Sequence, residues 1–363
     1  MSDKIFHRLL LFPLIDCWRP ALLTAAVLGA GLSPPSLASD PAAVTALSSE
    51  QPLRVELQGA TLQNGADNTT SGRATVTYSF NEATFLGGTL EATRGTGLVN
   101  LDSDLSLHEL YLTRSLIPDS TLTLTAGQLD LTSYFDRNSF AKDGTVHFAN
   151  PTFQTNPALA AAGLESEPAL LASWRPTDHL LTKVAVFSSG GVNNLSPDGV
   201  AAEVGWQSGT AIMRLTYVTG RDAGDNTSFE EAYGLARAGG ALQSTDREHA
   251  VGLNAEWFMP ESNVGLFARY GLYYHPALDR AAQTYSVGGS VGDVLVPGDR
   301  VGVAYGQALS NSRLRDARSD VAELFYDRSI APGLRVGASL QSTDGFSDTQ
   351  LGLRVRTNTD LLP

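Results

Sequence analysis

The sequence predicts an all-β fold, a transmembrane antiparallel β-barrel of about sixteen strands, and three observations lead to this prediction. Short segments of alternating polarity follow one another from residue 53 almost to the C-terminus. The connections between these segments tend to be long and short in turn. A strand of about ten residues tilted by about 40° covers the ~25 Å apolar band of a membrane barrel, so each segment is long enough to cross.

The alternation of polar and apolar side chains is clearest near the C-terminus. In Leu334–Gln341, Leu, Val, Ala and Leu alternate with Arg, Gly, Ser and Gln. Successive side chains of a strand point to opposite faces, so one face would meet lipid and the other a wet lumen. A soluble secreted β-protein alternates in the same way, so this pattern alone does not separate the two classes.

Sixteen segments fit a strand pattern in this sequence. They are 53–62, 72–81, 85–94, 105–115, 120–129, 168–175, 179–188, 200–208, 210–219, 248–258, 263–273, 282–291, 300–309, 319–328, 333–341 and 349–357. The fourth is less regular, because His108 and Glu109 interrupt the alternation. The sixth, Pro168–Arg175, has a buried helix end as its alternative.

The lengths of the connections distinguish a membrane barrel from a soluble sandwich. Even-numbered connections are mostly tight turns rich in Pro, Gly, Asp and Ser, such as Pro176–Asp178. Odd-numbered ones include the long runs 130–167 and 221–247, and the second run contains Phe229–Arg237, which has the pattern of a short helix. Bacterial barrels have short periplasmic turns and long outer loops, and an even strand count places both termini in the periplasm. The sorting of loops therefore favours the membrane barrel.

The predicted domain organisation has three parts: a signal peptide at 1–38, a short periplasmic N-terminal segment at 39–52 and the barrel domain at 53–363. The signal combines basic residues, an apolar stretch too short to span a bilayer as a helix, and a small-residue cleavage site at Ser36–Ala38. The only cysteine, Cys17, lies inside this signal, and the preceding Asp16 argues against a lipid anchor. The mature chain is therefore expected to use neither disulfides nor thiolate metal sites.

Charge limits the classes of partner. The formal net charge is −13 and the isoelectric point about 4.8, which argues against nucleic-acid binding. No cofactor is predicted. The expected partners are outer-membrane lipids, the barrel-assembly machinery and small hydrophilic solutes, and the sequence leaves open whether barrels associate as homotrimers.

Charged residues fall on the face that alternates with the apolar one, so we expect them in the lumen. The candidate lumen-lining residues are Arg214, Arg269, Glu323, Arg335, Arg354 and Arg356. Rings of charge can set ion selectivity. The alternative is that facing charges of opposite sign pair across the lumen and stiffen the wall.

The most distinctive stretch is Gly127–Asp143, with the sequence GQLDLTSYFDRNSFAKD. It resembles the signature region of the carbohydrate-selective porin (OprB) family, which includes cyanobacterial outer-membrane porins. The resemblance continues through Phe148, Phe153 and Asn156–Pro157 and reappears at Phe267–Gly271 and Glu323–Tyr326. It implies a single barrel of sixteen strands, passive diffusion of small hydrophilic solutes, and a long loop after the fifth strand that folds inwards and narrows the channel.

By this resemblance, six residues lie at or near the channel constriction: Asp130, Asp136, Arg137, Asn138, Lys142 and Asp143. They would offer charge and hydrogen bonds that replace part of a solute's hydration. The alternative is that Tyr134, Phe135 and Asp136 anchor the loop to the wall. Phe135 is the residue most suited to such an anchor.

The sequence departs from the family pattern in three ways. Lys142 and Gly144 stand where a more polar and acidic run is expected. The room before the first strand is too small for the peptidoglycan-binding domain that cyanobacterial relatives usually carry. The chain ends in Thr359–Pro363 without a terminal aromatic residue, so either the last strand stops near Thr357 or barrel assembly uses another signal.

Aromatic residues near strand ends have two interpretations. They are Tyr78, Phe80, Trp174, Trp206, Tyr217, Trp257, Phe258, Tyr273 and Tyr274. Aromatic girdles lie at both membrane interfaces of barrels, and we expect most of these residues to belong to them. The alternative is a flat platform on which the apolar face of a sugar stacks.

Four functions compete. The leading one is a porin for small hydrophilic solutes, with a preference for carbohydrates implied by the resemblance, and the second is a channel mainly for inorganic ions. A barrel enzyme is disfavoured, because the histidines are scattered and no His-Glu-x-x-His motif occurs. A purely structural barrel would have a plugged lumen.

Overall fold

The computed structural model describes residues 52–96, 104–117, 121–192, 195–221, 246–276, 279–311 and 319–362. The expected signal peptide, nearly all of the segment 39–52 and the expected helix at Phe229–Arg237 lie outside these ranges.

The described residues form sixteen strands. These strands are β1 Leu53–Asn64, β2 Asp67–Asn81, β3 Thr84–Thr96, β4 Asp104–Ser115, β5 Leu122–Asp130, β6 Ser166–Thr177, β7 Leu180–Phe187, β8 Gly199–Ser208, β9 Ala211–Arg221, β10 Arg247–Met259, β11 Val264–His275, β12 Arg280–Gly292, β13 Arg300–Ser310, β14 Asp320–Ala331, β15 Leu334–Thr343 and β16 Asp348–Leu362.

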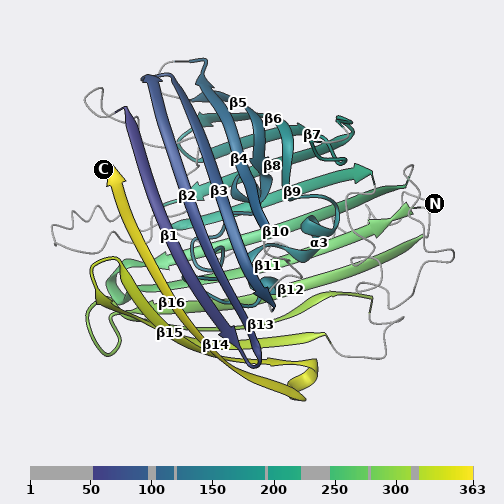
Figure 1. The fold of residues 1–363 in the computed structure, drawn as a ribbon. Coiled ribbons are helices and arrows are strands. Elements are labelled where there is room, and N and C mark those ends of the chain that lie inside the picture. Colours follow the sequence, from purple (N-terminus) through teal and green to yellow (C-terminus); the bar gives the residue numbers. More distant parts are fainter. Residues whose placement is uncertain are drawn as a thin grey trace. The chain divides into compact units, whose positions relative to one another are not determined.

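The strands close into one antiparallel barrel in which each pairs with its neighbours in sequence. The first and last strands complete the ring, with Ala60 of β1 opposite Arg356 of β16. Figure 1 shows β1 in purple beside β16 in yellow. Closure leaves no unpaired strand edge, which would be costly in lipid because its N–H and C=O groups would have no partner. The predicted fold class and strand number are confirmed.

Each of the sixteen expected segments overlaps one strand of the barrel. Pro168–Arg175 belongs to β6, so the alternative of a buried helix end is wrong. The last strand does not stop near Thr357, because β16 continues to Leu362, which pairs with Val55 of β1. An assembly signal other than a terminal aromatic residue therefore stays as the prediction.

The two faces of the wall differ in polarity. Leu215, Leu253 and Tyr270 are neighbours across β9, β10 and β11, and all three are exposed. The adjacent row on the other face, Arg214, Asn254 and Arg269, is buried and polar. The exposed face is thus apolar and the opposite face polar, as expected when the first meets lipid and the second faces the lumen.

Exposed aromatic side chains cluster near the short turns. Tyr78, Phe80, Trp174, Trp206 and Trp257 are all exposed and lie a few residues from the turns that follow or precede their strands. This placement is typical of an interfacial girdle. Tyr273 differs, because it is fully buried in a core cluster and does not belong to the girdle.

Several turns show why the chain reverses where it does. Between β14 and β15, Gly333 has a φ of 69°, a conformation that glycine adopts without steric cost, and it follows Pro332. Its carbonyl oxygen accepts a hydrogen bond of 2.8 Å from the Asn358 amide of β16, so the turn is also tied to the next strand.

In the described part of the chain, every helix is too short or too polar to cross a membrane. Two of these helices, α2 (Pro151–Gln154) and α3 (Pro157–Ala161), belong to the connection between β5 and β6.

Candidate functional site

The connection between β5 and β6, Leu131–Glu165, is called the β5–β6 segment below. It consists of the short 3₁₀ helix η3 (Leu131–Ser133), α2, α3 and ordered turns. The three helices begin at side-chain caps: Asp130, Asn150 and Asn156 each accept a hydrogen bond from the amide two residues further on. Proline occupies the first turn of α2 and α3, where its missing N–H is not needed.

Apolar side chains of the segment pack against the polar face of the barrel wall in two clusters. The first joins Tyr134, Phe135 and Leu159 with Phe187 of β7 and Tyr273 of β11. The Phe135 side chain is fully buried there, as expected for an anchor.

The second cluster is aromatic. Phe148 lies at the centre, with ring centroids 5.4 Å from Phe153, 5.7 Å from Phe267 of β11 and 5.0 Å from Phe325 of β14. Edge-to-face and tilted pairs at these distances are favourable beyond the burial of their area. The segment is therefore held by packing on opposite sides of its chain.

Three wall carboxylates accept hydrogen bonds from backbone amides of the segment. Glu203 of β8 accepts from Asp136 at 2.9 Å, and Glu256 of β10 accepts from Ser139 at 2.6 Å. Glu323 of β14 accepts from Ala149 at 2.8 Å and from the next amide at 2.9 Å. Bonds to a charged acceptor are stronger than those between neutral groups, so these glutamates hold the backbone of the segment.

Wall cations donate to carbonyl oxygens of the same segment. Arg214 of β9 donates to Arg137 at 2.8 Å, Lys183 of β7 to Tyr134, and Arg269 of β11 to Phe153. Arg354 of β16 donates to the carbonyls of Val146 and His147 and lies 4.8 Å from the Phe325 ring centroid.

The same charges pair with one another. Arg214 lies 2.6 Å from Glu256, Lys183 lies 3.6 Å from Glu203, and Arg269 Nε lies 3.4 Å from a carboxylate oxygen of Asp136. No side chain in these pairs is more than 5% exposed. The pairing expected along the wall is therefore present, but its partners include the segment. Removing one member of such a pair is costly, because the other charge stays buried alone.

The six residues expected at the constriction divide into two groups. Asp130, Asp136 and Asn138 are buried in local contacts: Asp130 caps η3, Asp136 pairs with Arg269, and Asn138 donates to Asn254 at 2.9 Å. Arg137, Lys142 and Asp143 are only half-buried. Among these, Lys142 donates to Thr132 and Asp143 accepts from the Thr145 amide at 2.8 Å.

Burial and charge explain the protonation of two groups in the segment. Burial raises the pKa of Asp136, while the neighbouring Arg269 and the Asn156 amide act in the opposite direction. Burial, with the guanidinium groups of Arg300, Arg354 and Arg356, holds the pKa of His147 well below its ordinary value. His147 is therefore neutral where it lies among these arginines.

The six predicted lumen-lining residues all lie on the polar face. Arg214, Arg269, Glu323 and Arg354 contact the β5–β6 segment as described above. Arg335 of β15 is tied to Asp327 of β14 and donates to the Gly298 carbonyl at 2.9 Å. Arg356 of β16 lies opposite Arg335 across the sheet and is half-buried.

Inward-facing charges near the seam of the barrel are more exposed than those under the segment. The Arg54 and Asp360 side chains of β1 and β16 are 46% and 48% exposed, and Arg73 of β2 is 40% exposed beside Glu91 of β3 at 22%. The β5–β6 segment therefore covers the wall from β7 to β14 more completely than the wall formed by β1 to β3. It reaches β1 at one point, where Gln58 donates to Thr145 at 3.1 Å.

Sequence reasoning missed Asn254 and Asn156. Asn254 of β10 donates to the carbonyl of Arg137 at 2.8 Å, and Asn156 donates to the carbonyl of Tyr270 at 3.0 Å. Both lock the segment to the wall. The only available signal was an asparagine at an inward position in β10, and the Asn-Pro pair that starts α3.

Sequence reasoning also overlooked Gly288–Gly292, which fits the Gly-x-Ser-x-Gly pattern of hydrolases. That pattern needs its serine on a sharp strand-to-helix turn. Ser290 instead lies within β12, where it pairs with Gly265 on one side and Gly302 on the other. The pattern therefore does not form a nucleophile elbow.

Across the described ranges, no group of three or more His, Cys, Asp or Glu residues is arranged to hold a metal ion.

A prediction concerns the close approach of the segment to β11. A Cβ atom on Gly265 would lie 2.0 Å from the Phe140 ring, so Gly265→Ala must displace that ring. We expect a loss of about 1–3 kcal/mol in the free energy of unfolding and faster protease cleavage of the segment. The control is Gly72→Ala on β2, where a Cβ atom meets nothing within 4 Å. Equal stability of the two variants in denaturant titrations would contradict the packing described here.

The fold is shared with solved outer-membrane proteins. OprB of Pseudomonas putida is 16% identical, with a TM-score of 0.62 over 85% of this chain and 94% of that one. OmpT of Vibrio cholerae with loop L8 deleted is 12% identical (TM-score 0.57; 85% and 98% covered), as is OmpF of Salmonella typhi in complex with daunomycin (0.54; 85% and 97%). No family model matches the sequence, and no curated protein matches it. At these identities the likeness shows the fold.

The location follows from the architecture. A closed antiparallel barrel of sixteen strands with an exposed apolar face and a polar opposite face is the form in which proteins span the bacterial outer membrane. The chain is an outer-membrane β-barrel.

Proposed function

We propose that this protein is a porin through which small hydrophilic solutes diffuse passively across the outer membrane. The observation that carries the proposal is the unequal cover of the inner wall. Charged side chains under the β5–β6 segment are at most 5% exposed, whereas Arg54, Asp360 and Arg73 on the seam side are 40% exposed or more. Solvent-accessible inward charges are expected beside a water-filled path and not in a plugged barrel.

In this proposal the β5–β6 segment lies inside the lumen and narrows it. Its hydrogen bonds to inward-facing residues of β7 to β16 support that placement. The free edge of the segment, Lys142–Thr145, then faces Gln58 and Arg73 on the seam side. Arg137, Lys142 and Asp143 are the constriction residues that we propose to contact solutes, whereas Asp130, Asp136 and Asn138 hold the segment in shape.

A preference for carbohydrates is the finer part of the proposal. Hydroxyl-rich solutes suit a constriction that combines donors and acceptors of both signs, such as Lys142, Asp143, Gln58 and Glu91. The structural likeness to P. putida OprB and the resemblance of Gly127–Asp143 to the carbohydrate-selective family support the same preference. The inward aromatic residues Phe187, Phe267 and Phe325 are buried, so polar contacts and not ring stacking would provide the selectivity.

The proposal is tested by swelling of liposomes that contain the refolded mature protein. We expect swelling in isotonic arabinose or glucose and little swelling in larger oligosaccharides, because the segment narrows the path. The matched sample is the Gly72→Ala variant, which should swell at the wild-type rate. Liposomes that exclude every sugar but pass inorganic ions would favour the ion channel, and an impermeable folded barrel would overturn the porin proposal.

A further inference from the structure

We propose that a pocket at the short-turn end of the barrel binds a small oxyanion, such as inorganic phosphate or the phosphoryl group of a small solute. The inference deepens the proposed function, because it names a class of solute that the channel would retain at this mouth. The pocket has a volume of about 460 Å³, including space open to solvent.

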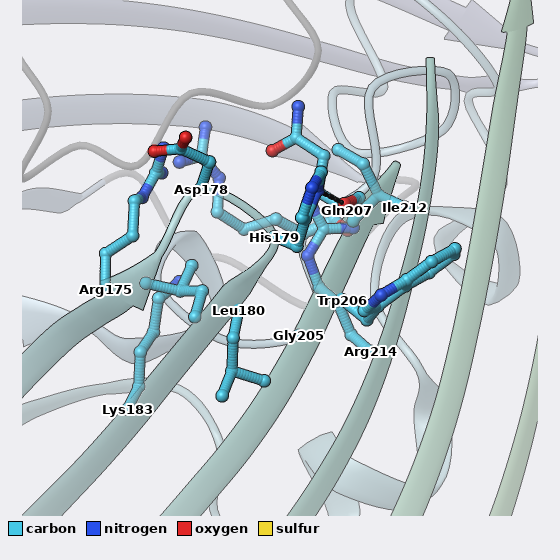
Figure 2. A pocket seen from close by; sticks show the side chains of 12 residues that line it. Arg175, Asp178, His179, Leu180, Lys183, Gly205, Trp206, Gln207, Ile212 and Arg214 are labelled. Atoms are coloured by element: carbon cyan, nitrogen blue, oxygen red, sulfur yellow. Dashed lines mark hydrogen bonds between the residues drawn. The ribbon is translucent and has the colours of Figure 1, made fainter. Parts of the chain in front are cut away.

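Two neighbouring short turns form the pocket. Arg175, Asp178 and His179 come from the end of β6 and the turn before β7, while Gln207 and Ile212 flank the turn between β8 and β9. Figure 2 shows these side chains around the hollow, with His179 beside Gln207. The His179 ring is fixed by a contact of 2.9 Å between Nδ1 and the Gln207 carbonyl oxygen. Both turns are tight, so they hold the rim of the pocket rigidly.

The lining is strongly basic. Arg137, Arg175, Lys183 and Arg214 contribute four positive charges, and Asp178 contributes one negative charge. Just beyond the lining, Glu203 and Glu256 pair with Lys183 and Arg214, as described above. Those two pairs neutralise the floor of the pocket, so the charge left for a ligand comes from Arg137 and Arg175 near its mouth.

Arg175 is the side chain best placed to bind. It is exposed, and its guanidinium makes no hydrogen bond or ion pair with any residue in the described part of the chain. Arg137 lies on the β5–β6 segment and is oriented by its own backbone, whose carbonyl accepts from Arg214 and Asn254 at 2.8 Å each. Two guanidinium groups provide planar, paired donors that match the oxygens of phosphate.

The surroundings favour an anion over a neutral sugar or a cation. A cation would meet four positive side chains, and the single carboxylate of Asp178 would not offset them. The partly enclosed space also strengthens charge interactions relative to bulk water. A neutral sugar would have to rely on Trp206, which lines the pocket but is turned towards the exposed face of β8.

Binding is tested directly by equilibrium dialysis of labelled inorganic phosphate against the refolded protein in detergent. We expect saturable binding that weakens about tenfold in Arg175→Gln, because one charge-assisted contact is lost. The control is Arg54→Gln, which removes an exposed inward arginine from the same end of the barrel but from β1, outside the pocket. Absence of saturable binding, or equal weakening in both variants, overturns the proposal.

A conductance arm separates this inference from the proposed function. Replacing chloride by phosphate at constant ionic strength should reduce single-channel conductance more in the wild type than in Arg175→Gln. Conductance steps without phosphate binding would overturn the oxyanion site and leave the porin proposal intact. Phosphate binding by a folded barrel that gives no steps would overturn the porin proposal and support the site.

Discussion

Replacing Arg269 by methionine is expected to lower the free energy of unfolding by about 3–5 kcal/mol and to loosen the β5–β6 segment. The variant leaves the Asp136 carboxylate buried without its cation and removes donors to the carbonyls of Phe153 and Asp136. Methionine fills a similar volume, so packing alone should contribute little to the loss. Urea unfolding followed by fluorescence measures the change, and protease cleavage within Leu131–Glu165 reports the loosening.

The control and the pH dependence make this prediction specific. Arg221→Met removes an exposed arginine at the end of β9 and should stay within about 0.5 kcal/mol of the wild type. Burial already raises the pKa of Asp136, and Arg269 opposes that rise. Without Arg269 the folded state would hold the Asp136 proton more tightly than the unfolded state, so the deficit should shrink as the pH falls. A variant as stable and as protease-resistant as the wild type would sink this account of the segment.

The second large effect is expected on the exposed face. Leu253→Arg should destabilise the barrel in a lipid bilayer by about 2–4 kcal/mol, because Leu253 lies near the middle of β10 among exposed apolar neighbours. The matched variant is Leu266→Arg, an exposed leucine near the short-turn end of β11, where the loss should fall to about 0–1 kcal/mol.

Reversible unfolding in large unilamellar vesicles measures both variants. The order of the two losses is the informative result, because only a lipid-facing wall makes the penalty depend on depth. Equal and small losses for Leu253→Arg and Leu266→Arg would contradict a membrane-facing role for the exposed residues.

The strands could be predicted because their signal is local. Alternation with a period of two marks each strand, and turn residues separate them, so even β6 with its proline was placed correctly. The expected polarity of the two faces followed from the same alternation. The end of β16 was not predictable, because Thr359 and Asp360 continue a strand only through their pairing with Leu57 and Glu56 of β1.

The candidate site was less predictable, because its contacts join residues far apart in sequence. Glu203, Glu256 and Glu323 were recognised as inward charges, but nothing local shows that they accept from amides of the β5–β6 segment. Likewise, alternation cannot separate Asp136, which is sealed against Arg269, from Asp143, which stays half-buried. Those differences depend on how the segment folds across the wall.

Planar-bilayer conductance of the refolded mature protein, with and without millimolar glucose or maltose, tests the central claim most directly. An open path beside the β5–β6 segment predicts stepwise conductance, and a carbohydrate preference predicts that sugar reduces the steps. Steps that sugar does not affect would favour a general or ionic pore. A protein that is folded as a β-barrel yet gives no steps would contradict the account.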